Sequence, residues 1–269
     1  MKQCTLIGHN GWTDYISQYA LRRHFLKDYD ICLLFVDSPE KIPFVKSLYP
    51  ESHIQVCVPK MTNTYDGVET CLCCHTLGSP YQCPRSRRSC IYVDYSVYKE
   101  YTNIRLNAFD NYTKWERFME GKSFLDAMYM YYTLDPLTII KQYKLVLDQQ
   151  QSIDFFDKHA PKNEPYVAIH DNRSTGLFIE NPTSYKAFYV DGISTCLTDT
   201  LLIFDRASEI HCIDSVYLFL LLILTIQYDT FREKKVFVYY RSIHTNGPYF
   251  AIQKYLPTSW IQKQITINE

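Results

Sequence analysis

The stretch CTLIGHNGWTDYISQYALRRHF, residues 4–25, decides the fold that the sequence predicts. Its apolar run at 4–8 indicates a strand, its two glycines a turn, and the spacing of apolar residues over 13–27 a helix. The alternation continues with strand ICLLFVD at 31–37, a helix over 39–49 and strand HIQVCV at 53–58. Because such alternation builds parallel sheets covered on both faces, we expect a Rossmann-like N-terminal half.

A second alternation of strands and helices occupies the C-terminal part of the chain. The polar segment APKNEP at 160–165 contains two prolines and indicates a linker. After it the sequence predicts strand YVAIH at 166–170, a helix over 195–207, strand EIHCI at 209–213, a helix over 215–228 and strand KVFVYY at 235–240. We therefore expect an α/β protein of two Rossmann-like halves, residues 1–160 and 161–269. A Cys-rich insert at 71–90 and helical sequence around 112–131 and 136–158 follow the first alternation.

Composition excludes several classes of protein. The 269 residues include 46% apolar and 21% charged residues, which is typical of a globular chain and not of a disordered one. A formal net charge of -1 gives no global field that would attract nucleic acid. The longest apolar run, residues 216–226, is shorter than the roughly 20 residues that cross a bilayer. We expect a soluble cytoplasmic protein with no membrane span.

Ligands of open parallel sheets bind beyond the carboxyl ends of the strands, so the residues after each predicted strand are the informative ones. The first of these segments is GHNGWTD, which ends in Asp14 at the start of a helix. Asp14 is interpreted either as a helix cap or as a catalytic carboxylate. The dinucleotide fingerprint GxGxxG is absent from the chain, which argues against a nicotinamide or flavin enzyme.

The second segment, HDNRSTG at 170–176, concentrates hydrogen-bond donors in one turn. It contains His170, Arg173, Ser174 and Thr175. An arginine beside hydroxyl groups suits a diphosphate, because the guanidinium presents a fixed charge and a bidentate fork. A plain solvated loop is the alternative interpretation.

The third group of residues follows the last two strands of the C-terminal half. Asp214 and Ser215 lie between strand EIHCI and an apolar helix, and Tyr240 and Arg241 follow strand KVFVYY. Ser215 is also explained as a helix cap, and His211 as a core histidine with a hydrogen-bond partner.

Together, HNGWTD, HDNRSTG and EIHCIDSVYLFL resemble a family of small glycosyltransferases of the GT-B type, found in bacterial polysaccharide clusters and large DNA viruses. Members carry HNGxxD, HDxxxxG and EIHCxDSxxLxL in this order and at similar spacing. The resemblance spans most of the chain, except for the Cys-rich insert and the helices after it. It implies two Rossmann-like halves facing a cleft. The His170 loop is also similar to the diphosphate-binding loop of GT-B fucosyltransferases, although it lacks their second arginine.

The resemblance implies transfer of a hexosyl, pentosyl or deoxyhexosyl group from a GDP- or UDP-sugar to a glycan acceptor, without a metal ion or cofactor. The C-terminal half would bind the donor and the N-terminal half the acceptor. Asp14 would be the general base, with His170 as the second candidate. The acceptor side would include Gly11, Trp12 and Thr13, and the donor side Arg173, Ser174, Thr175, Asp214, Ser215, Tyr240 and Arg241.

Four cysteines of the insert could form a structural zinc site. Cys71 and Cys74 form a CxxC pair, and Cys83 and Cys90 would complete a tetrahedral set. Reduced cysteines and a disulfide remain alternatives. A zinc knuckle beside the PRSRR segment at 84–88 raises a rival function, nucleic-acid binding. A catalytically inactive carbohydrate-binding relative is the third interpretation.

Overall fold

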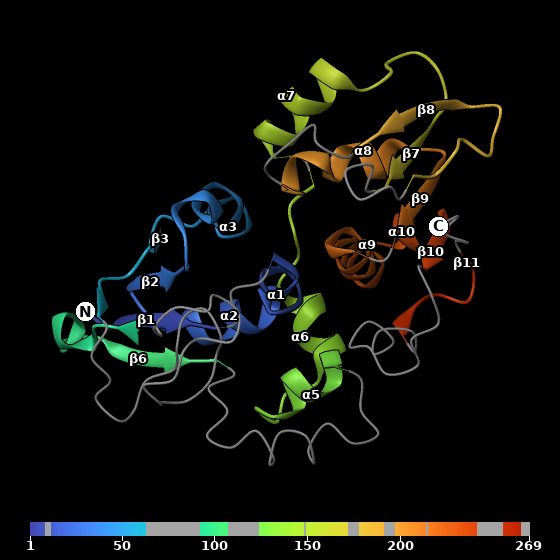
Figure 1. The fold of residues 1–269 in the computed structure, drawn as a ribbon. Helices are drawn as coiled ribbons and strands as arrows, with labels where there is room; N and C mark the ends of the chain where they lie inside the picture. Colours follow the sequence, from blue (N-terminus) through green and yellow to red (C-terminus); the bar gives the residue numbers. More distant parts are fainter. Residues whose placement is uncertain are drawn as a thin grey trace. The chain divides into compact units, whose positions relative to one another are not determined.

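A computed structural model describes residues 1–8, 12–62, 92–106, 124–147, 149–171, 178–190, 197–213, 215–240 and 255–264. At six of these positions it describes the backbone alone, namely Trp12, Thr13, Phe124, Tyr240, Gln262 and Gln264. The chain divides into two compact units (Figure 1). The first contains Met1–Lys122 and Asp126–Asp135, and the second contains Ser123–Leu125 and Pro136–Glu269.

The first unit is built on a four-stranded sheet in the order β3-β2-β1-β6, with every neighbouring pair parallel (Figure 1). Its strands are β1 (Gln3–Ile7), β2 (Ile31–Phe35), β3 (Ile54–Cys57) and β6 (Thr102–Arg105). The first three are the strands that the sequence predicts. The prediction missed β6, an edge strand of polar sequence TNIR.

Helices cover one face of this sheet. They are α1 (Trp12–Ser17), α2 (Tyr19–Leu26), the short 3-10 helix η1 (Pro39–Lys41) and α3 (Ile42–Leu48). The predicted helix over 13–27 is interrupted at Gln18. Hydrogen bonds from Gln18 N to Asp14 O (2.9 Å) and from Arg22 N to Gln18 O (2.8 Å) run across this interruption. The two segments therefore continue the same helical bonding.

The opposite face carries an apolar cluster around Phe35 and Val93. Val93 belongs to a two-stranded antiparallel sheet of β4 (Met61–Thr62) and β5 (Tyr92–Val93). The 3-10 helix η2 (Tyr95–Tyr98) follows, and its Tyr95 and Tyr98 pack against the cluster. The part of α5 (Phe124–Met130) from Asp126 onward also belongs to this unit, and its Tyr129 hydroxyl donates to Ser17 O of α1 at 3.0 Å.

The second unit is built on a five-stranded parallel sheet in the order β11-β10-β9-β7-β8. Its strands are β7 (Tyr166–His170), β8 (Lys186–Tyr189), β9 (Glu209–Ile213), β10 (Lys235–Tyr240) and β11 (Ile261–Gln264). Strands β7, β9 and β10 match the prediction. The two edge strands, β8 and β11, were not predicted.

A buried apolar helix, α9 (Val216–Gln227), packs against β9. Every residue from Tyr217 to Gln227 is buried, as expected for a helix that is apolar on all sides. This burial explains the long apolar run of the sequence. Within the described ranges, no helix is long and apolar enough to cross a membrane. The unit also contains η4 (Leu197–Thr200), α8 (Leu201–Arg206) and α10 (Asp229–Arg232).

Two helices before the predicted linker, α6 (Pro136–Gln142) and α7 (Gln150–His159), belong to the second unit. The buried Gln227 side chain donates to Ile140 O at 2.9 Å and to Tyr143 O at 3.0 Å, and it accepts from Leu145 N at 2.9 Å. These bonds tie the chain around α6 to the end of α9. The second compact unit thus takes up the chain continuously from Pro136, whereas the sequence predicts a boundary at residue 160.

We expect Gln227→Leu to lower the free energy of unfolding by about 3 kcal/mol, because it leaves buried backbone groups without partners. Urea denaturation measures this loss. Gln150→Ala is the matched control, since Gln150 is exposed and donates to the exposed Asp154 at 2.8 Å. This substitution should cost less than about 0.5 kcal/mol. A Gln227→Leu loss no larger than the control's would contradict the role of Gln227.

Candidate functional site

The strand order places one candidate loop at a reversal point in each sheet. In the first unit β2 and β3 lie on one side of β1 and β6 on the other, so the order reverses between β1 and β6. In the second unit β8 lies on one side of β7 and β9 on the other. Ligands of open parallel sheets bind beyond the carboxyl ends of strands at such reversal points. In the chain, HNGWTD begins two residues after β1, and HDNRSTG begins at His170, the last residue of β7, so each predicted segment starts beside a reversal point.

The buried Gly8 follows β1 at the first reversal point. A Cβ atom at Gly8 would lie 2.5 Å from Oε1 of Gln18 and 2.9 Å from a terminal nitrogen of Arg22. A side chain at this position would therefore displace the ends of the buried Gln18 and Arg22 side chains and disturb the hydrogen bond between them. Glycine leaves room for these two side chains against the end of β1.

Arg22, beneath Gly8, is completely buried. Its Nε donates to Gln18 Oε1 at 3.1 Å, and its guanidinium carbon lies 4.5 Å from the ring centre of Tyr15. Burial raises the pKa of Tyr15, so this ring stays neutral beside the cation. Arg22 was not among the residues predicted from the sequence. The available signal was its helical spacing from the apolar residues Tyr15, Tyr19 and Leu26, which places it on the buried side of the helix.

Asp14 is the third residue of α1 and is partly exposed. It therefore lies within the first turn of the helix that follows the first reversal point. Of the predicted acceptor-side residues, Trp12 and Thr13 belong to α1 by their backbone, and Gly11 lies outside the described residues.

His170 ends β7 at the second reversal point and is 6% exposed. Its ring centre lies 4.1 Å from that of Tyr217, the second residue of α9. Burial lowers the pKa of His170 to about 4, so its imidazole is neutral near pH 7. Among the residues that the structure describes, Nδ1 of His170 has no hydrogen-bond partner. A neutral ring can donate from one nitrogen and accept at the other.

Ser215 caps α9 beside this ring. Its Oγ accepts from Tyr217 N at 3.2 Å, and its carbonyl oxygen accepts from Leu218 N at 3.1 Å. The hydroxyl hydrogen of Ser215 is not consumed by the cap and can still be donated to a ligand. The amino end of a helix carries partial positive charge, so this position favours an anionic ligand.

The remaining predicted donor-side residues fall where side chains are not described. Tyr240 ends β10 and is described by its backbone alone. Arg173, Ser174, Thr175, Asp214 and Arg241 lie outside the described residues. The same holds for the predicted zinc ligands Cys71, Cys74, Cys83 and Cys90. In the described ranges no group of three or more His, Cys, Asp or Glu side chains is arranged to hold a metal ion.

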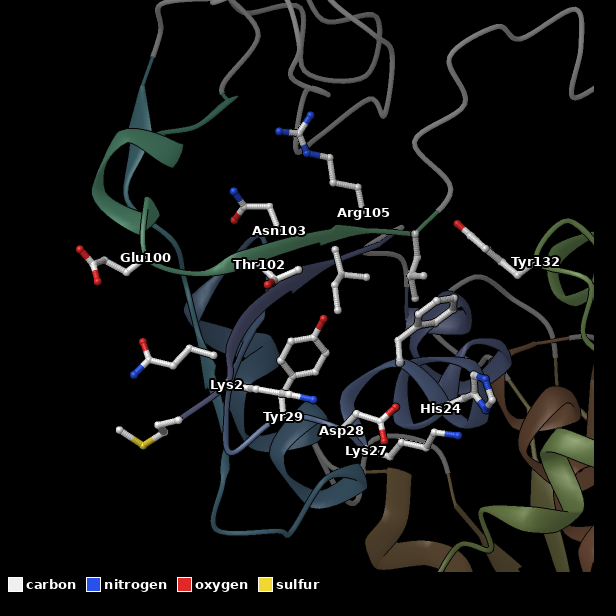
Figure 2. Close-up of a pocket in the computed structure, with 15 residues that line it drawn as sticks. Lys2, His24, Lys27, Asp28, Tyr29, Glu100, Thr102, Asn103, Arg105 and Tyr132 are labelled. Atoms are coloured by element: carbon white, nitrogen blue, oxygen red, sulfur yellow. The ribbon is translucent and has the colours of Figure 1, made fainter.

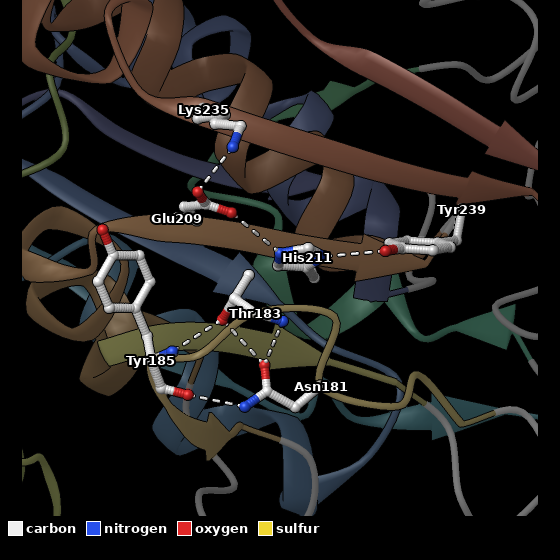
Figure 3. Close-up of polar contacts among 7 residues, drawn as sticks. All are labelled: Asn181, Thr183, Tyr185, Glu209, His211, Lys235 and Tyr239. Atoms are coloured by element: carbon white, nitrogen blue, oxygen red, sulfur yellow. Dashed lines mark hydrogen bonds and ion pairs between the residues drawn. The ribbon is translucent and has the colours of Figure 1, made fainter. Parts of the chain in front are cut away.

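A chain of polar contacts around the buried Glu209 and His211 runs across β9 and β10 and reaches the exposed Lys235; it was not predicted from the sequence (Figure 3). Lys235 Nζ donates to Glu209 Oε1 at 2.7 Å, and the other carboxylate oxygen of Glu209 lies 3.6 Å from His211 Nε2. Nδ1 of His211 lies 2.9 Å from the Tyr239 hydroxyl. His211 is completely buried and stacks on Phe237 at 4.5 Å. His211 is thus a core histidine with a hydrogen-bond partner, as one interpretation of the sequence predicted.

Burial is the main cause that lowers the pKa of His211 to about 4. Glu209 opposes this shift, while Lys263 and Lys235 add to it. Burial also raises the pKa of Tyr239. The chain therefore holds a neutral imidazole next to a neutral phenol.

A cavity of about 910 Å³ lies along β6 in the first unit (Figure 2). Its lining combines charged and aromatic side chains, including Lys2, His24, Lys27, Tyr29, Arg105 and Tyr132. Of the predicted site residues whose side chains the structure describes, Asp14, His170 and Ser215 are not among those that line it.

We expect His170 and His211 to make the fold lose stability in mild acid. Burial lowers the pKa of each histidine from an ordinary 6.5 to about 4, so the unfolded chain takes up these protons at higher pH than the folded protein. The contribution of each histidine to the free energy of unfolding is on the order of 2 kcal/mol. It is fully present above about pH 6.5 and is lost as the pH falls toward about 4.

Urea denaturation at about pH 7 and about pH 5 tests this expectation, since most carboxylates stay ionised over that range. His170→Gln and His211→Gln should each remove about half of the pH-dependent loss. His159→Gln, which replaces an exposed histidine of α7, controls for removal of an imidazole. If His170→Gln and His211→Gln both lose as much stability between these two pH values as the wild type does, the two histidines are not the cause of the pH dependence.

Comparison with protein-family models, curated proteins and solved structures finds no match to the chain. Its function must therefore be inferred from its own residues.

Proposed function

We propose that the protein is a glycosyltransferase that moves a sugar from a nucleoside-diphosphate sugar to a glycan acceptor without a metal ion. The observation that supports this proposal most directly is the arrangement of side chains at the second reversal point, where β7 ends. There the buried, neutral His170 lies against the first turn of α9, whose amino end is capped by Ser215. The proposal includes the GT-B arrangement, in which the two units act together in one transfer.

The chemistry of the donor supports this assignment. Departure of a nucleoside diphosphate leaves negative charge on the diphosphate, which hydrogen-bond donors and a helix amino end stabilise. His170 and Ser215 supply donors from the described structure. Because His170 is neutral, fixed positive charge must come from other residues. We assign that charge to Arg173 and Arg241, with Ser174, Thr175, Asp214 and Tyr240 as further contacts.

The acceptor would bind at the first reversal point, near Gly11, Trp12 and Thr13. An acceptor hydroxyl needs a base to remove its proton as the new glycosidic bond forms. Asp14 in the first turn of α1 is partly exposed, as a group that meets substrate must be. We assign the role of general base to Asp14. His170 is assigned to the diphosphate because it lies beside the amino end of α9.

Nucleotide binding is the first test of the donor site. Purified protein should melt at a higher temperature in the presence of one of GDP or UDP, because a ligand that binds only the folded state stabilises it by about 2.7 kcal/mol at a hundredfold excess over Kd. Arg173→Ala should abolish this stabilisation. Arg232→Ala on α10 is the matched control and should retain it. The absence of stabilisation by any nucleoside diphosphate or nucleotide sugar would overturn the proposed function.

Asp14→Asn tests the general base. Loss of a positioned base should lower kcat by about a hundredfold or more, while nucleotide stabilisation stays at the wild-type level. Asp28→Asn replaces an exposed aspartate of the same unit and should keep wild-type turnover. Full turnover by Asp14→Asn would remove Asp14 from this role. Nucleotide binding with neither transfer nor donor hydrolysis in the wild type would identify an inactive binding relative instead.

A further inference from the structure

The cavity of about 910 Å³ along β6 has the size of a ligand site (Figure 2). Ligand pockets in proteins typically enclose roughly 300–1,000 Å³. Its described walls are the first residues of β1, the end of α2 with the turn after it, β6, and Tyr132 after α5. All of these residues belong to the first unit. The walls are therefore built within one compact unit.

Aromatic side chains line one part of the cavity. Phe25 and Tyr132 lie with their ring centres 5.2 Å apart, and Tyr29 also lines the cavity. Each of the three is partly exposed, so some ring surface is accessible to a ligand. The planes of Phe25 and Tyr132 meet at 73°, so a flat base cannot stack on both rings at once. A sugar ring needs only one aromatic face, against which it places its C–H groups.

The polar side chains of the lining differ in charge and in hydrogen-bonding capacity. Lys2 and Lys27 can only donate hydrogen bonds, whereas the carboxylate of Glu100 can only accept them. The amides of Gln3 and Asn103 can do both. A ligand with a single kind of charge would be repelled by part of this lining. A hydroxyl group both donates and accepts, so the lining suits a neutral compound with many hydroxyl groups.

Hydrogen bonds hold two of the cavity walls in place. Lys2 N donates to Asp30 Oδ2 at 2.7 Å, and Asp30 N donates to Lys2 O at 2.8 Å. Across β1 and β6, Asn103 Oδ1 accepts from Thr5 Oγ1 at 2.6 Å, and the NH2 group of Asn103 can still donate to a ligand. Walls that are fixed before a ligand arrives lower the entropic cost of binding it.

The cavity reaches the carboxyl end of β6, where the strand order of the first sheet reverses. Arg105 lines the cavity and is paired with Ile7, the last residue of β1. The proposed acceptor site follows the same end of β1. Strand β6 spans roughly 10 Å from its first residue to its last. A ligand that follows the strand from this end is therefore longer than a single sugar ring.

We propose that the cavity along β6 binds a neutral oligosaccharide, with sugar rings against Phe25, Tyr29 and Tyr132 and hydroxyl groups against the polar lining. In the transfer reaction it holds the part of the acceptor chain that lies away from the reacting hydroxyl. This acceptor role rests on the proposed function, whereas the binding of sugar in the cavity does not.

A glycan array of neutral and acidic oligosaccharides tests the binding directly. The purified full chain should bind neutral oligosaccharides, and calorimetric titration with a soluble one then gives Kd. Tyr132→Ala should weaken this binding about tenfold because an aromatic face is lost, and Tyr132→Phe should restore it because the ring is kept. Tyr185→Ala removes an exposed tyrosine of the second unit and should bind as the wild type does.

Gln3→Ala is the second variant, and it carries the test if Tyr132→Ala does not fold. It removes an amide from the cavity and should weaken binding of the same oligosaccharide about fivefold. The proposal is overturned if the wild type binds no glycan or only acidic ones. It is also overturned if the variants that fold keep the wild-type affinity.

Steady-state kinetics test the acceptor role separately. With a long neutral acceptor, Tyr132→Ala should raise KM about tenfold and leave kcat unchanged, because the cavity does not contact the reacting atoms. With a monosaccharide acceptor KM should stay the same. An unchanged KM for the long acceptor would overturn the acceptor role. A wild type that binds the oligosaccharide but no nucleoside diphosphate would reject the proposed function and support the cavity assignment.

Discussion

The parallel pairing of strands within each sheet is the constraint on which the other features depend. Since neighbouring strands run in the same direction, their carboxyl ends meet at one edge of the sheet. In the second unit His170 is paired with Cys212, and Ile213 with Tyr239. From β7 to β9 to β10, each strand therefore ends one residue beyond its neighbour. This register brings the loop after His170 and the cap residue Ser215 to the same edge.

Burial then gives similar polar residues different roles. His170 and His211 are both buried and both have a pKa lowered to about 4, so charge does not distinguish them. Their partners do. His211 is bonded to Tyr239, whereas Nδ1 of His170 has no partner within the described part of the chain. The hydrogen bond of His211 within its sheet accounts for that ring as a core residue, whereas the unbonded Nδ1 of His170 near the amino end of α9 is a feature on which the proposed diphosphate site depends.

The central strands were predictable and most edge strands were not. Strands β1, β2, β7, β9 and β10 each lie between two other strands in the interior of a sheet. Their sequences are therefore continuous apolar runs. The missed strands β6, β8 and β11 all lie at sheet edges, where polar sequences such as TNIR and IQKQ are tolerated. Without β6 and β8 neither sheet shows a reversal in strand order. The sequence therefore indicated loops after strands but could not show which of them lie at a reversal point.

By itself the sequence determined the central strands, the apolar helix α9 and the Ser215 cap, because these features depend on residues close together in the chain. Only the tertiary structure decided which polar groups are buried and what they contact. The burial of Arg22 beneath Gly8 depends on how a helix packs against a strand. Gln227 fixes α6 in the second unit through carbonyl groups more than 80 residues earlier in the chain. Such contacts join residues that local patterns do not relate, so packing alone specifies them.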